Sequence, residues 1–250
     1  MKMISCKIFY REVSLLTARS PHYFDVTYLR QGLHAHPDRL RGVLQAEIDA
    51  VDSMTDIHTN YPPDGGSFDA ILLGYALCSN CVEGLSSARH TLVLPKAHDC
   101  VSLFLGSRER YSDYFFNHKG TFWSNASWAE NCFLPDGRRA AAALAGFTKR
   151  YGAERAAKLL SASERWKDNY SGTTFIRWGE FSGTDIQAEA ERRCRACAEY
   201  NGWAFDTLEG DSAWMRRFLD GDWDDERFLV VPPGRRIILT YDERLVDYGR

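Results

Sequence analysis

Thiol and imidazole side chains occur at the ends of two apolar segments in the first half of the chain. Cys78 follows the apolar segment 68–77, and His98 and Cys100 follow the apolar segment 91–94. Such continuous apolar segments are typical of buried strands in a parallel sheet. α/β proteins bind ligands where the carboxyl ends of these strands meet. We therefore expect Cys78, His98 and Cys100 to converge there, with His98 and Cys100 on one side if their segment is extended.

A mixed set of thiols and imidazole supports metal chemistry. Cysteine and histidine are common zinc ligands, and zinc with an open coordination position activates a bound water or thiol. We predict a metal site formed by Cys78, His98 and Cys100, with zinc as the first candidate and iron or another transition metal as alternatives. Cys6, within the β-rich segment 3–10, is a candidate fourth ligand. Packing in the core is the more common role for a cysteine at such a position.

Cys100 is also a candidate catalytic nucleophile without a metal, with His98 or a more distant histidine as its base. Asp99 is expected to cap a helix that begins at Cys100. The amino end of a helix favours a thiolate, which would activate Cys100. The structural alternative is that His98 caps a helix or is a hydrogen-bonded core histidine, and that the cysteines serve packing alone.

Three further residues are candidates for binding a substrate or cofactor. Lys96 lies at the end of the same predicted strand as His98 and would offer a cation to an anionic substrate. Thr121 and Trp123 lie in the segment 120–123, which would line the site if it folds over it. A plain surface loop is an equally good interpretation of that segment.

Two Cys-x-x-Cys pairs are present, Cys78/Cys81 and Cys194/Cys197. Paired motifs of this kind can indicate zinc ribbons or iron–sulfur sites, but these two pairs are too far apart in sequence for a ribbon. Residues three apart share a face of a helix, so Cys194 and Cys197 are predicted to pack in the core along a helix over 185–200. Cys132 is assigned a structural role.

Strand and helix patterns alternate along the chain, which predicts an α/β fold with an open, largely parallel sheet and flanking helices. Helices are expected over 100–116 and 138–159, among others. The second half repeats the pattern, so we expect two Rossmann-like lobes, 1–135 with the Cys/His site and 136–250. The alternative is one continuous domain.

Composition and charge argue against several classes of protein. The formal net charge is -3, and the arginine pairs are scattered. A nucleic-acid-binding protein would show a basic stripe instead. Apolar segments fall short of the roughly 20 residues that cross a bilayer, and the segment 1–10 does not have the pattern of a signal peptide. We therefore predict a cytoplasmic protein without a membrane partner, in which the seven cysteines are reduced.

Four stretches of the sequence resemble a known prokaryotic family. They are LGYALCSNCVEGL, LVLPKAHDCVSLFLGSRERY, GTFW and FLVVPPGRRIILTYD, of which the block from Ala97 to Ser107 is the most specific. Over most of its length the chain resembles the family catalogued as domain of unknown function 1638. Cys78, His98 and Cys100 match the family pattern, whereas the position of Cys81 is often glycine in it.

The resemblance implies a link to one-carbon metabolism, because members of the family occur beside corrinoid-dependent methyl-transfer systems. The expected partners are a small-molecule substrate and a methyltransferase or corrinoid protein. The function predicted from residues and resemblance together is that of a metal-dependent transferase or hydrolase, or of an accessory protein. A non-catalytic partner of a methyltransferase is a further hypothesis, although the chain has no D-x-H-x-x-G cobalamin motif.

Overall fold

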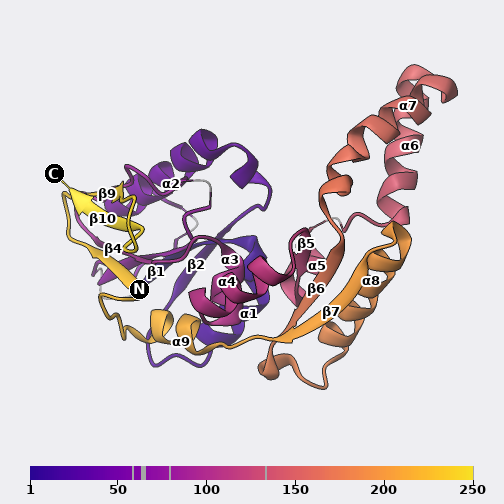
Figure 1. The fold of residues 1–250 in the computed structure, drawn as a ribbon. Coiled ribbons are helices and arrows are strands. Elements are labelled where there is room, and N and C mark those ends of the chain that lie inside the picture. The colour runs from indigo at the N-terminus through magenta and orange to yellow at the C-terminus, as the bar shows by residue number, and fades with distance from the viewer. Residues whose placement is uncertain (58, 63–65, 79, 133, 250) are drawn as a thin grey trace. The chain divides into compact units, whose positions relative to one another are not determined.

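The structure is a computed structural model that describes residues 1–57, 59–62, 66–78, 80–132 and 134–249. Contacts divide the chain into two compact units (Figure 1). Unit 1 consists of residues 1–108 and 211–250, and unit 2 of residues 109–210. The two lobes predicted from the sequence meet at residue 135, whereas the contacts divide the chain after residues 108 and 210. The reason is that the segment 211–250 returns to unit 1 and completes its sheet.

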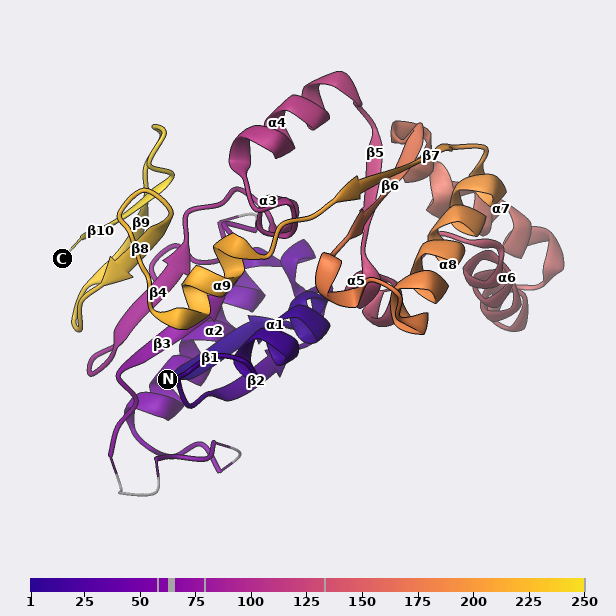
Figure 2. The same ribbon diagram turned by 90° about the horizontal axis from the view of Figure 1, so that it is seen from below.

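Five of the described strands of unit 1 form one sheet. In the order of the sheet they are β2 (Asp25–Leu29), β1 (Lys2–Cys6), β3 (Ala70–Gly74), β4 (Thr91–Pro95) and β8 (Phe228–Val231). The first four are parallel, and β8 is antiparallel to β4. The predicted open, largely parallel sheet is confirmed, and β3 and β4 are neighbours in it (Figure 2).

Helices cover both faces of this sheet (Figures 1 and 2). They are α1 (Tyr10–Thr17), α2 (Pro37–Asp52), α3 (Cys100–Leu105) and α9 (Ala213–Asp220), with the short 3-10 turns η1 (Lys7–Phe9) and η2 (Leu33–Ala35). α2 lies on one face, and α9 contacts α1 and α3 on the other. The antiparallel pair β9 (Arg236–Leu239) and β10 (Val246–Gly249) follows β8.

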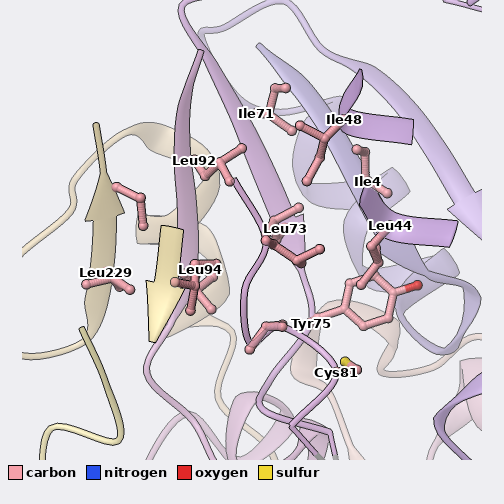
Figure 3. Packing of buried hydrophobic residues seen from close by; sticks show 14 of the residues in the cluster. Ile4, Leu44, Ile48, Ile71, Leu73, Tyr75, Cys81, Leu92, Leu94 and Leu229 are labelled. Carbon is pink, nitrogen blue, oxygen red and sulfur yellow. The ribbon is translucent and has the colours of Figure 1, made fainter. Parts of the chain in front are cut away.

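The main core of unit 1 lies between the sheet and α2. Successive side chains of a strand point to opposite faces, so alternate residues of β1, β3 and β4 meet the apolar stripe of α2. The residues packed there include Ile4, Ile71, Leu73, Leu92, Leu94, Leu44 and Ile48 (Figure 3). The strands are buried on their other face as well, where Met3, Leu72 and Val93 lie. Packing on both sides therefore positions the carboxyl ends of β1, β3 and β4.

The helix predicted over 100–116 is two helices, α3 and α4 (Arg108–Asn117). Gly106 between them has a left-handed backbone with φ of 71°. A Cβ atom at Gly106 would lie 2.7 Å from the Asp211 Cβ and 2.8 Å from the Asp211 carbonyl oxygen. The Asp211 N–H also donates to the Phe104 carbonyl at 3.1 Å. The break therefore occurs where the returning chain passes close to the end of α3.

Unit 2 contains a second parallel sheet, in the order β5 (Thr121–Ser124), β6 (Gly172–Arg177) and β7 (Ala204–Glu209). Its further helices are α5 (Ala126–Asn131), α6 (Gly137–Tyr151), α7 (Ala153–Glu164) and α8 (Asp185–Asn201), with the 3-10 turns η3 (Arg165–Asn169) and η4 (Gly179–Phe181). The predicted helix over 138–159 divides at Gly152 into α6 and α7, which pack against each other.

In the described part of the chain, none of the helices has the length and apolar character that crossing a bilayer requires.

Candidate functional site

The strands β1 and β3 flank the point where the connections of the unit 1 sheet change direction. From β1 the chain passes to β2 on one side, and it then returns to β3 and β4 on the other side. In open parallel sheets, ligands bind beyond the carboxyl ends of the strands at such a switch point. Cys6 is the last residue of β1, and Cys78 lies in the segment after β3. The predicted edge therefore carries two cysteines at the position where a ligand is expected.

Cys78 has an unusual backbone conformation. Its φ of 43° lies in the left-handed region, which few residues other than glycine adopt. The Cys78 N–H donates to the His98 carbonyl at 3.4 Å, and the Leu77 N–H donates to the Ala97 carbonyl at 2.9 Å. Hydrogen bonds to the segment after β4 thus hold Cys78 in this conformation. Strained residues of this kind cluster at functional sites.

Four thiols, those of Cys6, Cys78, Cys81 and Cys100, form what we call the thiol cluster. A hydrogen bond with Cys81 and then burial raise the pKa of Cys78 well above its usual value. Burial, followed by the charges of Cys78, Asp99 and Cys6, raises the pKa of Cys100 in the same way. Burial raises the pKa of Cys6 to about 12, with a further contribution from Cys78. The thiols of Cys6, Cys78 and Cys100 therefore lie within electrostatic range of one another, and burial favours their protonated form.

Tyr75 lies beside the thiol cluster. Its side chain is 2% exposed, and its hydroxyl has no hydrogen-bond partner within the described residues. Burial and then Cys6, Cys81 and Cys78 raise the pKa of Tyr75. Figure 3 shows Tyr75 and Cys81 at the end of the core where β3 stops. A buried hydroxyl without a partner is unusual in proteins, which makes Tyr75 a candidate hydrogen-bond donor to a ligand.

Cys100 is the first residue of α3, as predicted, and Asp99 is its cap. The Asp99 carboxylate accepts hydrogen bonds from the Val101 N–H at 3.0 Å and the Ser102 N–H at 3.2 Å. Burial opposes the thiolate expected at this helix start, because it raises the pKa of Cys100. Burial is the main cause, and the capping carboxylate adds a negative charge where a thiolate would form.

Of the predicted ligands, Cys6, Cys78 and Cys100 influence one another's charge, and Cys81 is hydrogen-bonded to Cys78. The side chain of His98 is exposed, while its carbonyl accepts the hydrogen bond from Cys78. Within the described residues, no three His, Cys, Asp or Glu side chains have the arrangement of a metal site. Metal binding therefore stays a prediction, carried by the chemistry of the donors.

The three predicted substrate-binding residues have protein contacts. Lys96 is 9% exposed, and its Nζ donates to the Asp225 carbonyl at 2.6 Å. Thr121 and Trp123 belong to unit 2, on β5. The Thr121 hydroxyl donates to the His118 carbonyl at 2.6 Å, and the ring of Trp123 is 8% exposed. Their role in binding stays a prediction.

The second Cys-x-x-Cys pair packs as predicted. Cys194 and Cys197 lie on α8 and are fully buried in the apolar core of unit 2. The nearby hydroxyl of Ser124 partly offsets the burial that raises the pKa of Cys194 to about 12. Burial likewise raises the pKa of Cys197 to about 11. This pair is surrounded by packing residues.

Sequence reasoning missed two members of the site, Tyr75 and Cys81. A tyrosine in a continuous apolar segment indicates packing, and only the missing hydrogen bond distinguishes Tyr75. Cys81 is fully buried and contributes to the apolar core as well as to the thiol cluster. The Cys-x-x-Cys spacing was the available signal for Cys81.

The fold and the site define an α/β protein with a thiol cluster at the switch point of a parallel sheet. Comparison with protein-family models gives a match over residues 28–219 to the family described as protein of unknown function (DUF1638). The chain belongs to this family, which confirms the resemblance noted in its sequence. The matched range contains Cys78, His98 and Cys100, and Cys6 lies outside it. Searches of the curated proteins and of the solved structures gave no significant match.

Proposed function

We propose that the protein binds a transition-metal ion, zinc first, at the thiol cluster, and that it serves one-carbon or methyl-transfer chemistry as an enzyme or accessory protein. The observation that supports the metal proposal is that Cys6 and Cys78 follow the ends of β1 and β3 at the switch point, within electrostatic range of Cys100. These three are the proposed ligands. His98, on the adjoining segment, and Cys81, beside Cys78, are the candidates for a fourth position.

The donor set fits a borderline or soft metal ion. Thiols bind such ions as thiolates, so each ligand must lose its proton. In the metal-free protein, burial and neighbouring thiols oppose this loss at Cys78 and Cys100. A divalent cation would offset the repulsion between thiolates and deprotonate them. Binding should therefore release protons, and the affinity should rise with pH.

When bound, zinc with an open coordination position supplies Lewis acidity that activates a water or a substrate thiol. The chain contributes the position of the ligands and the groups around them. The ends of β1 and β3 hold Cys6 and Cys78 against a buried core. The hydroxyl of Tyr75, which has no hydrogen-bond partner among the described residues, is the candidate donor of a hydrogen bond to that ligand. Thiol activation is the chemistry that connects this site with methyl transfer.

The metal-free alternative, with Cys100 as the nucleophile, has weaker support. Nucleophilic cysteines react as thiolates and normally have a lowered pKa. Burial and then Cys78 and Asp99 raise the pKa of Cys100. A non-catalytic role beside a corrinoid methyltransferase rests on the family context, and co-purification with a methyltransferase subunit would support it.

The test is elemental analysis of anaerobically purified protein, followed by titration with Co²⁺ as a spectroscopic probe. We expect about one metal ion per chain in the wild type, with a thiolate-to-cobalt charge-transfer band. Cys78→Ser and Cys100→Ser should each lose both signals. Cys132→Ser is the matched control, because Cys132 belongs to unit 2, and it should keep both.

Two further variants, His98→Ala and Cys81→Ser, identify the fourth ligand by comparison of their cobalt spectra. Wild-type protein with less than ~0.2 equivalents of any transition metal and no affinity for added zinc would overturn the proposal. Proton release on zinc addition provides an independent readout, since each bound thiol gives up a proton.

A further inference from the structure

A serine, a histidine and an aspartate form a hydrogen-bonded chain at the amino ends of β3 and β4, away from the thiol cluster. The Ser67 Oγ lies 2.5 Å from the His90 Nε2. The His90 Nδ1 lies 2.6 Å from the Asp52 Oδ1. The hydroxyl thus meets one ring nitrogen and the carboxylate meets the other, which is the arrangement of the Ser-His-Asp triad in hydrolases.

The surroundings of Asp52 favour its ionised form. Burial opposes ionisation, but hydrogen bonds from His90, Ser87 and Ala88 outweigh it and lower the pKa of Asp52. The Ser87 hydroxyl donates to this carboxylate at 2.7 Å, and the Ala88 N–H donates at 2.6 Å. An ionised Asp52 accepts the N–H at Nδ1 of His90. The lone pair at Nε2 is then directed at the hydroxyl of Ser67, as a general base requires.

The three residues of this hydrogen-bonded network differ in burial. Asp52 and His90 are 8% and 4% exposed, whereas Ser67 is exposed. The backbone N–H of His90 also donates to the Ser87 hydroxyl at 2.8 Å, and this hydrogen bond fixes the backbone that carries the ring. The base and its orienting carboxylate are therefore held in the protein, while the nucleophile reaches solvent.

Ser67 also lines a pocket of about 500 Å³. This volume is in the range of small-molecule sites. Tyr23, Pro62 and Phe68 contribute apolar and aromatic surface to the pocket, and Asp69 contributes a carboxylate. Met1 and His22 line the same pocket, and the charge of the Met1 amino terminus interacts with that of Asp69. These opposite charges offset each other, so the pocket suits a small neutral molecule with an apolar part.

We propose that Ser67, His90 and Asp52 form a second, hydrolytic site for small neutral carboxylic esters. The Ser67 Oγ forms a bond to the acyl carbon while the His90 Nε2 takes the hydroxyl proton. The ester C–O bond then breaks, and His90 returns that proton to the departing alcohol. Water attacks the acyl-serine in the same way, which yields the carboxylic acid and free Ser67. Asp52 is a positioning residue in this scheme.

The experiment is labelling of the full-length protein with a fluorophosphonate, which phosphonylates activated serines. Peptide mapping by mass spectrometry should find the adduct on Ser67. The labelling rate should fall by about a hundredfold or more in His90→Gln, since removal of the base leaves an ordinary hydroxyl. Ser67→Ala should carry no adduct at this peptide, and its circular dichroism should match that of the wild type.

Ser171→Ala is the matched control, because Ser171 is an exposed serine of unit 2, and it should label at the wild-type rate. Labelling should also be unaffected by a metal chelator, which separates this site from the thiol cluster. Hydrolysis of p-nitrophenyl acetate, measured after the thiols are blocked, should be lost in Ser67→Ala. Folded wild-type protein without an adduct on Ser67, or an equal labelling rate in His90→Gln, would overturn the proposal and leave the network a structural one.

Discussion

The two Cys-x-x-Cys pairs have the same spacing but different surroundings. Cys78 and Cys81 lie in a turn after a central strand, within electrostatic range of further thiols and of Tyr75. Cys194 and Cys197 lie in the middle of α8 and face an apolar core. All four residues are free cysteines. The spacing of a motif therefore does not determine its role, since its place relative to the sheet decides which groups surround it.

The strongest test of this difference is the effect of zinc on stability. At about a thousand times its dissociation constant, zinc should add about 4 kcal/mol to the free energy of unfolding of the wild type, because the ion binds the folded state alone. Cys78→Ser should lose this gain, and Cys197→Ala should keep it. Denaturation under reducing conditions, with and without zinc, provides the measurement. Equal stabilisation of both variants would abolish the distinction between the pairs.

Buried polar groups distinguish the units in a second way. Asp52→Asn should destabilise the protein by about 3 kcal/mol, because it breaks a buried network to His90, Ser87 and Ala88. Glu191→Gln in unit 2 is the matched variant and should cost about 1 kcal/mol or less, since its partner Arg177 is partly exposed. Urea unfolding near neutral pH measures both values, and similar costs would contradict this ranking.

The same network has a defined dependence on pH. The pKa of Asp52 is lowered in the folded protein from its ordinary value of 3.8. The carboxylate therefore stabilises the fold above about pH 4, and its contribution is lost as the pH falls through the folded pKa. Asp52→Asn should abolish this part of the acid sensitivity. Unfolding curves from pH 7 down to about pH 3 test the sign, and an unchanged slope in the variant would contradict it.

Glycine substitutions should have opposite effects on stability in the two Cys-x-x-Cys pairs. Cys78→Gly should stabilise the metal-free protein by roughly 0.5 to 1 kcal/mol, since glycine adopts a left-handed backbone without strain. Cys197→Gly should cost about 2 kcal/mol, because it removes a buried side chain and weakens a helix interior. Chemical denaturation of both variants without metal is sufficient. A loss of stability in Cys78→Gly would show that the packing of the Cys78 side chain against the core outweighs the relief of its backbone.

The smallest expected effect concerns the charge at the start of α3. Asp99→Asn keeps a capping side chain, so helix stability should change by only a few tenths of a kcal/mol. The loss of the carboxylate should lower the pKa of Cys100 and speed its alkylation by iodoacetamide about two- to fivefold at pH 8. Peptide mapping, with Cys194 as the internal reference, measures the change. An unchanged rate at Cys100 would mean that Asp99 does not act on the thiol.

The sequence predicted the parallel sheet and the edge at which Cys78 and Cys100 lie, because β3 and β4 are continuous apolar segments with unambiguous ends. It left the role of Cys6 open, since hydrophobic patterns indicate strands but not their order in a sheet. Sequence alternation placed His98 on the same side as Cys100, but α3 begins at Cys100 and ends the alternation. The exposed side chain of His98 follows from that helix start.

The Ser67, His90 and Asp52 network could not be found from sequence. His90 is separated from Asp52 by 38 residues and from Ser67 by 23 residues, and no local motif connects them. The end of α2 and the amino ends of β3 and β4 bring the three together. Serine, histidine and aspartate are common residue types. The network is recognised only in the structure, where Ser67 contacts the Nε2 of His90 and Asp52 contacts its Nδ1.

The insertion of unit 2 within unit 1 has a consequence for synthesis. β4 pairs with β8, and the residues 96–227 between them must be made first. At a translation rate of about 5 to 20 residues per second, the edge of β4 stays unpaired for roughly 7 to 26 seconds on the ribosome. An exposed strand edge is a template for pairing with other chains. We therefore expect this protein to aggregate more slowly at low expression temperature. We also expect chaperones that bind nascent chains to protect it.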